Sequence, residues 1–226
     1  MKLYMHPVST TSRPILLLIA EYKLDIEPVV VDLFAGEHMG QDYAGKNPNM
    51  LVPLIEDGDF RLSECSAILK YLADRFELPC YPADLEQRAK VNECMDWFNT
   101  QFSREYGYGL VYPQLFPHHH RENEDVQKAT IAWGKERAER WLTILDRDII
   151  GAEKPYLCGD DITIADFFAA GHVTLGELAR CNFSAYPNVC RWLGNMKQLE
   201  SWDSVHQEFY GLAEQLKDKP FEAIGA

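Results

Sequence analysis

The sequence predicts an α/β domain over about residues 1–78 and an all-helical domain over about residues 83–226. Three observations support this division. Short strand-like apolar patterns occur before residue 63, a proline-rich segment follows near residue 80, and the rest of the chain has apolar residues at helical spacing. With 46% apolar residues in a chain of 226, both domains have enough apolar surface to form a core.

The first elements are a strand, a polar turn and a helix. Residues 2–5 have the pattern of a short strand, and Ser9–Ser12 offer several N-cap candidates before the apolar run Ile15–Ala20. This run is apolar on all sides, which predicts a helix packed between other elements. Val29–Val31 is a continuous β-branched run, and we expect it to form a second strand covered on both faces.

A β-hairpin and a helix are predicted next. Residues 52–55 and 60–62 flank the turn Asp57-Gly58, a pattern typical of a hairpin. Pro53 cannot donate to a sheet ladder, so it belongs at a strand start or an edge, where a cis peptide bond is one way to accommodate it. A helical pattern of apolar residues follows from Ile68 to Phe76, which completes a βαβ unit followed by ββα.

Residues 79–82, Pro-Cys-Tyr-Pro, indicate a linker because two prolines within four residues end any helix. Beyond it, apolar residues recur at helical spacing in five segments. A cap-like sequence at Thr163–Asp166 precedes the third of them. The predicted helices span residues 85–106, 124–149, 167–178, 189–199 and 205–216.

Charge excludes several classes of partner. The chain has 22 Lys and Arg against 35 Asp and Glu, giving a net charge of −13. Such a chain repels phosphate backbones and anionic lipids, so we predict neither a nucleic-acid partner nor a membrane partner. No run approaches the roughly 18 apolar residues of a membrane span, and the first residues lack the apolar stretch of a signal peptide. We therefore expect a soluble, cytoplasmic protein.

The cysteines and histidines do not predict a metal site. Six cysteines are scattered without CxxC spacing, which indicates reduced, mostly buried thiols. The run His118–His120 is more typical of a solvated loop, because adjacent histidines cannot easily converge on one ion.

Two motifs in this order resemble the soluble glutathione transferases over nearly the whole chain. The first is the segment Leu3–Arg13, where a strand leads to Ser9 and then to an arginine, as in the theta and phi classes. The second combines Asn47-Pro48, Val52-Pro53, Asp57-Gly58 and residues 62–72. The resemblance implies a thioredoxin-like first domain, a helical-bundle second domain, a homodimer, and glutathione as cosubstrate without a metal.

The resemblance also implies that Ser9 holds the glutathione sulfur as a thiolate, with Thr10 as the reserve candidate. A free thiol with a pKa near 8.5 is only slightly ionised at neutral pH. Lowering that pKa by about two units requires roughly 2.7 kcal/mol of preferential stabilisation of the anion. A hydroxyl donor and the positive end of the following helix both stabilise an anion at this place. The alternative role for Ser9 is a plain helix N-cap.

For glutathione itself, the family pattern implies contacts on both sides of the hairpin. The backbone of Val52, before a cis Pro53, would pair with the cysteinyl part as an added strand does. His38 resembles the theta-class histidine that reaches the glycyl carboxylate; the alternative is a solvated loop histidine. Met50-Leu51 stands where that class often has lysines, so this end of glutathione would be held less tightly.

The γ-glutamyl end requires a carboxylate for its ammonium group and an anion site for its own carboxylate. Glu64 and the start of the following helix offer both. Cys65 stands where the family usually has serine, so a strong hydroxyl donor is lost unless Ser66 replaces it. Without the resemblance, Glu64 would be interpreted as an acidic residue that complements the helix dipole.

The second substrate would bind against the helical domain. Residues on its first long helix face the thiol in this family, and the candidates here are Arg104, Tyr106, Tyr108, Tyr112 and Phe116. Aromatic residues at such spacing also occur in ordinary helix cores, which is the alternative for each of them.

The predicted reaction is attack of the glutathione thiolate on an electrophilic carbon, by conjugation or by halide displacement. One alternative is a glutathione-dependent thiol–disulfide oxidoreductase, although neither position 9 nor position 10 is a cysteine. The other is a noncatalytic binding protein of the same fold. Ser9, Val52-Pro53 and Glu64 occur together in this chain, and only binding of the tripeptide requires all of them. This argues against the noncatalytic alternative.

Overall fold

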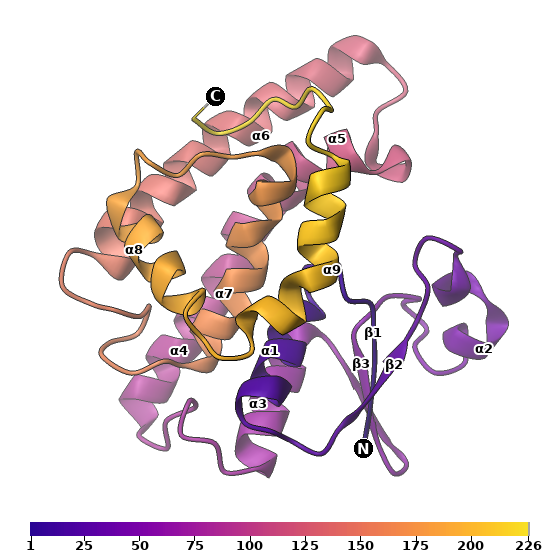
Figure 1. Ribbon diagram of the computed structural model, residues 1–226, viewed down its shortest axis with the longest axis vertical. Coiled ribbons are helices and arrows are strands. Elements are labelled where there is room, and N and C mark those ends of the chain that lie inside the picture. Colours follow the sequence, from indigo (N-terminus) through magenta and orange to yellow (C-terminus); the bar gives the residue numbers. More distant parts are fainter. Residues whose placement is uncertain (226) are drawn as a thin grey trace.

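The computed structural model describes residues 1–225 and confirms the predicted fold class (Figure 1). A small mixed sheet with helices forms the N-terminal part, and helices form the rest. The N-terminal elements are β1 (Lys2–Met5), α1 (Arg13–Glu21), β2 (Glu27–Val30), η1 (Glu37–Met39), α2 (Gln41–Ala44), β3 (Leu54–Asp57), β4 (Phe60–Ser63) and α3 (Cys65–Arg75).

The sheet has the strand order β2-β1-β3-β4, with β1 parallel to β2 and antiparallel to β3. The predicted hairpin is confirmed, since β3 and β4 pair antiparallel from Leu54 opposite Ser63 to Asp57 opposite Phe60. The prediction that the second strand is covered on both faces is wrong. β2 lies at the sheet edge, and Val30 is 55% exposed. A β-branched run indicates a strand but does not fix its place in the sheet.

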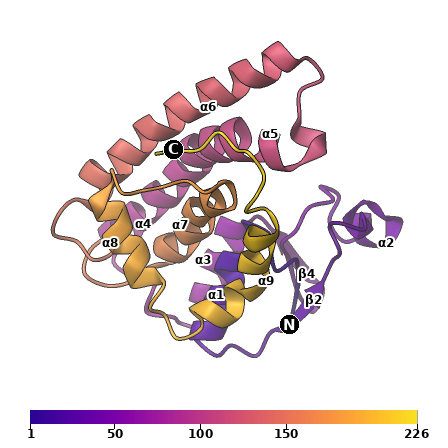
Figure 2. The same cartoon turned by 45° about the horizontal axis from the view of Figure 1, so that its top comes forward.

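Ten helical segments follow in residues 76–225, and Figure 2 shows α7 and α9 beside α1. Each predicted helix overlaps one or two of these segments. They are α4 (Leu85–Trp97), η2 (Phe98–Val111), α5 (Tyr112–Leu115), η3 (Pro117–His119), α6 (Glu124–Ile144), η4 (Leu145–Ile150), α7 (Ile164–Thr174), η5 (Leu175–Ala179), α8 (Pro187–Met196) and α9 (Trp202–Gln215). In residues 1–225, no helix has the length and apolar character that crossing a membrane requires.

Helix α7 is the central helix of the molecule, and every one of its residues is buried. The predicted cap is present: the Asp166 carboxylate accepts from the Thr163 backbone N–H at 2.8 Å and from Leu157 N–H at 2.8 Å. Trp192 Nε1 donates to the same carboxylate at 2.9 Å. Four partners for one buried carboxylate, counting the Thr163 hydroxyl at 2.9 Å, fix the start of α7.

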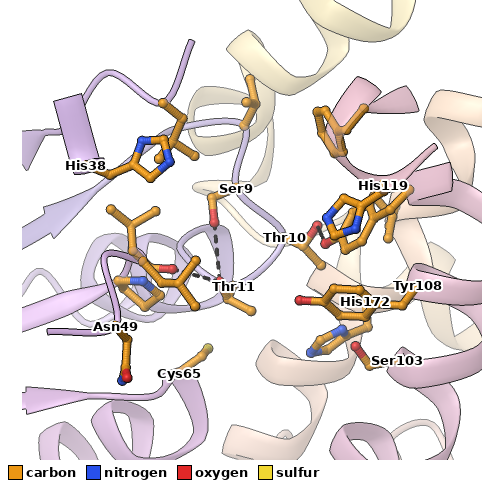
Figure 3. A pocket seen from close by; sticks show the side chains of 18 of the residues that line it. Ser9, Thr10, Thr11, His38, Asn49, Cys65, Ser103, Tyr108, His119 and His172 are labelled. Atoms are coloured by element: carbon orange, nitrogen blue, oxygen red, sulfur yellow. Dashed lines mark hydrogen bonds between the residues drawn. The ribbon is translucent and has the colours of Figure 1, made fainter. Parts of the chain in front are cut away.

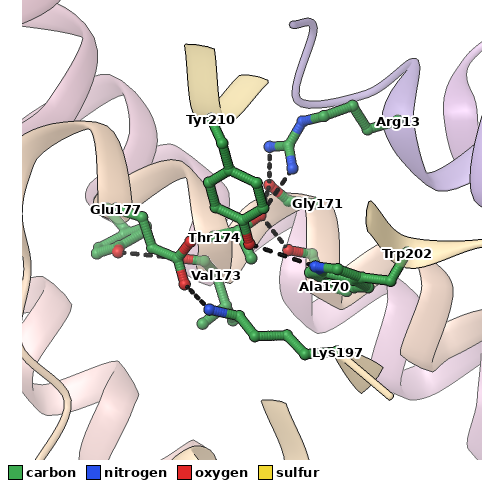
Figure 4. Close-up of polar contacts among 10 residues, drawn as sticks. Arg13, Ala170, Gly171, Val173, Thr174, Glu177, Lys197, Trp202 and Tyr210 are labelled. Atoms are coloured by element: carbon green, nitrogen blue, oxygen red, sulfur yellow. Dashed lines mark hydrogen bonds and ion pairs between the residues drawn. The ribbon is translucent and has the colours of Figure 1, made fainter. Parts of the chain in front are cut away.

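The two parts of the chain join where α7 meets α1. A Cβ atom on Gly171 would lie 2.5 Å from the Thr10 carbonyl oxygen, so this close approach requires glycine. Arg13, fully buried on α1, donates to Thr174 Oγ1 at 2.9 Å and to the Gly171 carbonyl at 3.1 Å (Figure 4). Its guanidinium also lies 3.8 Å from the Phe209 ring centroid. Arg13 therefore joins the two parts of the chain as a structural residue.

Candidate functional site

A cavity of about 600 Å³ lies between the sheet side of the molecule and the helical domain (Figure 3). On the sheet side, its lining comes from residues 8–11, 33–38, 47–53 and 63–65. The helical side contributes lining residues from η2 to η3, from α7 and η5, and Leu212 of α9. The cavity thus receives side chains from both predicted domains.

The turn before α1 presents three hydroxyl groups to this cavity. Ser9 Oγ accepts from the Ser12 backbone N–H at 3.2 Å and lies 3.3 Å from Thr11 Oγ1. Thr11 Oγ1 in turn donates to the Val52 carbonyl at 3.3 Å. The bond from Ser12 is the kind that a capping residue accepts. Because Thr11 donates its own proton to Val52, Ser9 is the donor in the Ser9–Thr11 contact, and a bound sulfur would compete with Thr11 Oγ1 for the Ser9 proton. Thr11 is a lining residue that the sequence analysis did not single out.

Thr10 is placed differently from its neighbours. Its side chain is 6% exposed, and Tyr112 donates to its Oγ1 at 2.9 Å. Burial raises the pKa of Tyr112 to about 12, so this phenol is a neutral donor at physiological pH. Thr10 therefore connects the turn to the helical domain, while Ser9 is the less buried hydroxyl.

The Val52–Pro53 peptide bond is cis, and Pro53 directly precedes β3, as predicted. The preceding loop is held by two donors to the Leu51 carbonyl, Tyr43 Oη at 2.8 Å and Asn47 Nδ2 at 2.7 Å. These bonds fix the backbone at the cavity wall before the cis bond.

Glu64 lies on the rim of the cavity, directly before α3. Its φ of 71° and ψ of 116° are unusual for a residue other than glycine. Strain of about 1–3 kcal/mol of this kind clusters at ligand sites. The side chain is exposed and lines the cavity, and the start of the eleven-residue helix α3 lies beside it.

The two residues after Glu64 have different environments. Cys65 lines the cavity and is 4% exposed. Burial, together with the Glu64 carboxylate, raises the pKa of the Cys65 thiol well above its usual range. The thiol is therefore neutral. Ser66 is not a lining residue in the described part of the chain, and its Oγ accepts from Asn99 Nδ2 at 3.4 Å. The compensation for the missing serine by the Ser66 hydroxyl stays a prediction.

On the helical side, Tyr108, Tyr112 and Phe116 line the cavity as predicted. The prediction is wrong for Arg104 and Tyr106. Tyr106 is fully buried and donates to the Val173 carbonyl at 3.1 Å. The Arg104 guanidinium instead forms an ion pair at 3.0 Å with the neighbouring Glu105 carboxylate, which is itself fully buried.

The reason for this error is the helix type. Segment η2 is a π-helix of 14 residues, and such a helix bonds i to i+5 and has more residues per turn than an α-helix. The lining residues of this wall accordingly recur at intervals of four and five: Asn99, Ser103, Tyr108, Tyr112 and Phe116. An α-helical period counted from Asn99 would put Tyr106 on this wall, whereas the observed spacing puts Tyr108 there.

The histidine run lies at the cavity mouth. His118 and His120 are exposed, as a solvated loop predicts, but His118 and the half-buried His119 also line the cavity. The His119 ring is stacked on Tyr112 with centroids 5.4 Å apart. Burial and the neighbouring His118 lower the pKa of His119. Within residues 1–225, no three metal-ligating side chains are grouped to hold an ion.

His38 lines the opposite wall, on the same side of the cavity as Asn49 but apart from it (Figure 3). Asn49, Ser103 and His172 are further polar lining residues that the sequence analysis missed. Asn49 directly follows the Asn47-Pro48 motif, so this motif could have indicated it. Nothing in the sequence indicated that His172 lines a cavity, because it lies in the middle of an apolar helix.

This fold and this cavity define a two-domain protein with a thioredoxin-like first domain. The chain matches the family models for the glutathione S-transferase N-terminal domain over residues 1–74 and the C-terminal domain over residues 112–200. It is 29% identical to human glutathione S-transferase theta-1 over 97% of this chain and 91% of the relative. It is 30% identical to the theta-1 enzyme of Bos taurus, over 85% and 80% respectively.

A solved structure of human glutathione transferase theta-2, in complex with glutathione and an unknown ligand, covers 99% of this chain and 93% of its own length. Its TM-score is 0.85 at 25% sequence identity. The chain therefore belongs to the glutathione S-transferase family. This confirms the predicted family and the predicted class of enzyme, a glutathione transferase.

Proposed function

We propose that this chain activates glutathione as a thiolate, with Ser9 as the donor, for attack on an electrophilic carbon of a small molecule. The carbon–sulfur bond forms while a halide leaves, or while the sulfur adds and the product takes a proton from solvent. One observation supports this most: the Ser9 hydroxyl, the Val52–Pro53 segment and Glu64 line a single cavity. Three unrelated local features converge there, as binding of one tripeptide requires.

In this proposal glutathione lies along the sheet wall. The Val52 backbone pairs with its cysteinyl part, which puts the sulfur near the Ser9 hydroxyl. Glu64 accepts from the ammonium group, and the backbone N–H groups at the start of α3 bind the α-carboxylate. His38 and Asn49 are the polar groups nearest the other end of the tripeptide.

The electrophile binds against the helical wall, between Tyr108, Tyr112 and Phe116. These are large aromatic side chains with few charges, which favours an apolar body in the second substrate. Because Arg104 lies outside the cavity and pairs with Glu105, we assign no cationic residue of η2 to this pocket.

The decisive experiment offers the purified protein and glutathione a panel of aryl halides, alkyl halides, epoxides and small disulfides. Thioether products support the proposal. Consumption of disulfides alone would favour the oxidoreductase alternative, which the neutral Cys65 thiol argues against. Glutathione binding without turnover on the whole panel would favour a noncatalytic binding protein.

We infer a homodimer in a reducing, cytoplasmic environment. Large apolar side chains are about half exposed on both parts of the chain: Leu51 and Phe60 near the sheet, Val126 and Trp133 on α6. Faces of this kind are buried in stable assemblies. The six cysteines are free thiols, as reducing conditions favour. Sedimentation equilibrium measures the mass, and Trp133→Glu should shift a dimer toward monomer.

A further inference from the structure

His172 is a buried polar side chain on the helical wall of the cavity. It lies on α7, is 3% exposed, and is among the lining residues. Figure 3 shows its imidazole beside Ser103 and Tyr108, on the opposite side from Thr11. Among residues 1–225 its Nε2 atom is buried and has no hydrogen-bond partner. Buried polar atoms are nearly always paired, so an unpaired one that lines a ligand cavity calls for an explanation.

The surroundings of His172 are aromatic and apolar. The Phe168 ring centroid is 4.5 Å from that of the imidazole, and Phe98 is stacked at 6.3 Å. Leu175 and Leu178 are further apolar residues of the cavity lining. These contacts hold the ring in place, so its nitrogens have a fixed position in the wall.

The imidazole is uncharged. Burial, with a smaller contribution from the Arg13 cation, lowers the pKa of His172 to about 3. A neutral imidazole has one donor and one acceptor nitrogen, so it can pair with a hydroxyl or another uncharged oxygen group. It is a weak base at neutral pH, which excludes a role in taking the proton of the glutathione thiol.

We propose that His172, with the Ser103 hydroxyl beside it, forms a hydrogen-bonding subsite for the second substrate. The subsite selects electrophiles with an apolar body that carry an uncharged oxygen substituent remote from the reacting carbon. It rests on the proposed function, because the reacting sulfur is assigned to the opposite wall at Ser9. A charged substituent is disfavoured here because it would lose its hydration in an apolar wall.

The test uses two conjugates that differ by one oxygen, S-benzylglutathione and S-(4-hydroxybenzyl)glutathione, with their dissociation constants measured by calorimetry. The wild-type protein should bind the hydroxylated conjugate about five- to tenfold more tightly, as one hydrogen bond to a buried group predicts. His172→Phe keeps an aromatic ring against Phe98 and Phe168 but removes both nitrogens. This variant should bring the ratio of the two dissociation constants to about one. It should leave the affinity for S-benzylglutathione unchanged.

His206→Phe is the matched control. His206 is also buried, but it lies outside the cavity lining, stacked on Trp202 with ring centroids 3.9 Å apart. The His206→Phe variant should keep the wild-type ratio of dissociation constants. Ser103→Ala is the substitute test if His172→Phe does not fold, and it should lower this ratio. Equal affinity for both conjugates in the wild type, or an unchanged ratio in a folded His172→Phe, overturns the subsite. Failure of both conjugates to bind overturns the proposed function instead.

Discussion

Replacing Ser9 with alanine should raise the pKa of the bound glutathione thiol while leaving glutathione bound. The hydroxyl interacts more strongly with thiolate than with thiol, so its loss acts on ionisation. One charge-assisted hydrogen bond contributes about 1.5–3 kcal/mol, which corresponds to roughly one to two pKa units. At neutral pH, turnover should fall by about ten- to a hundredfold, and it should recover as the pH is raised.

The cost to folding should be small. Ser9→Ala removes the acceptor that the Ser12 N–H uses at 3.2 Å, a loss of about 0.5–2 kcal/mol for a capping bond. The start of α1 stays anchored, since the buried Arg13 side chain still donates to Thr174 and Gly171. An activity loss in this variant would therefore come from the site and not from unfolding.

The assay is ultraviolet absorbance of the bound thiolate, followed against pH in the wild type, Ser9→Ala and Thr10→Val. Thr10→Val is the matched control, because its hydroxyl is engaged by Tyr112 at 2.9 Å and is largely buried. It should leave the thiol pKa within a few tenths of a unit. If Thr10→Val raises the pKa and Ser9→Ala does not, Thr10 is the catalytic hydroxyl. If neither does, backbone donors and the α1 dipole activate the sulfur, and the reasoning for Ser9 is refuted.

Three further predictions concern binding and stability. Glu64→Gln should weaken glutathione binding by about 1.5–3 kcal/mol in calorimetry, because the ammonium loses its charged partner. Gly134→Ala should lower the unfolding free energy by about 1–3 kcal/mol in urea titrations, since its Cβ would lie 2.3 Å from the Gly109 carbonyl carbon. Burial lowers the pKa of His172 and His206 to about 3, so unfolding protonates both below pH 6.5. Stability should then fall by up to about 1.4 kcal/mol per pH unit for each, and His206→Phe should reduce the total slope by up to that amount.

The parts of the fold that local chemistry determines were predictable from sequence. The turn Asp57-Gly58 between two apolar runs gives a hairpin because its residues favour the backbone of that turn. Pro53 had to stand at a strand start because it lacks an N–H. The apolar run at Ile15–Ala20 required neighbours on several sides, and α1 is packed against α3, α7 and α9.

Features that depend on distant contacts were not predictable in this way. The run Val29–Val31 predicts a strand whatever its place in the sheet. β2 is an edge strand because β1 is its only neighbour in the sheet of the described residues. The π-helical form of η2 accompanies a close crossing with α6, where Gly109 meets Gly134. The contact between two glycines 25 positions apart cannot be recognised in the sequence. The side of η2 on which Tyr106 lies therefore could not be predicted from residue spacing.

The two walls of the cavity differ in what defines them, and this difference has a consequence for specificity. The sheet wall is shaped by backbone features, a positive φ at Glu64 and the starts of α1 and α3, together with the side chains of Ser9 and Glu64. Substitutions on this wall should change glutathione affinity either by removing a side chain that we propose to contact it, as at Glu64, or by changing the local backbone conformation. On the helical wall, side chains at intervals of four and five define the shape. A single residue inserted or deleted in η2 would therefore present a different set of side chains to the electrophile while leaving the glutathione wall intact.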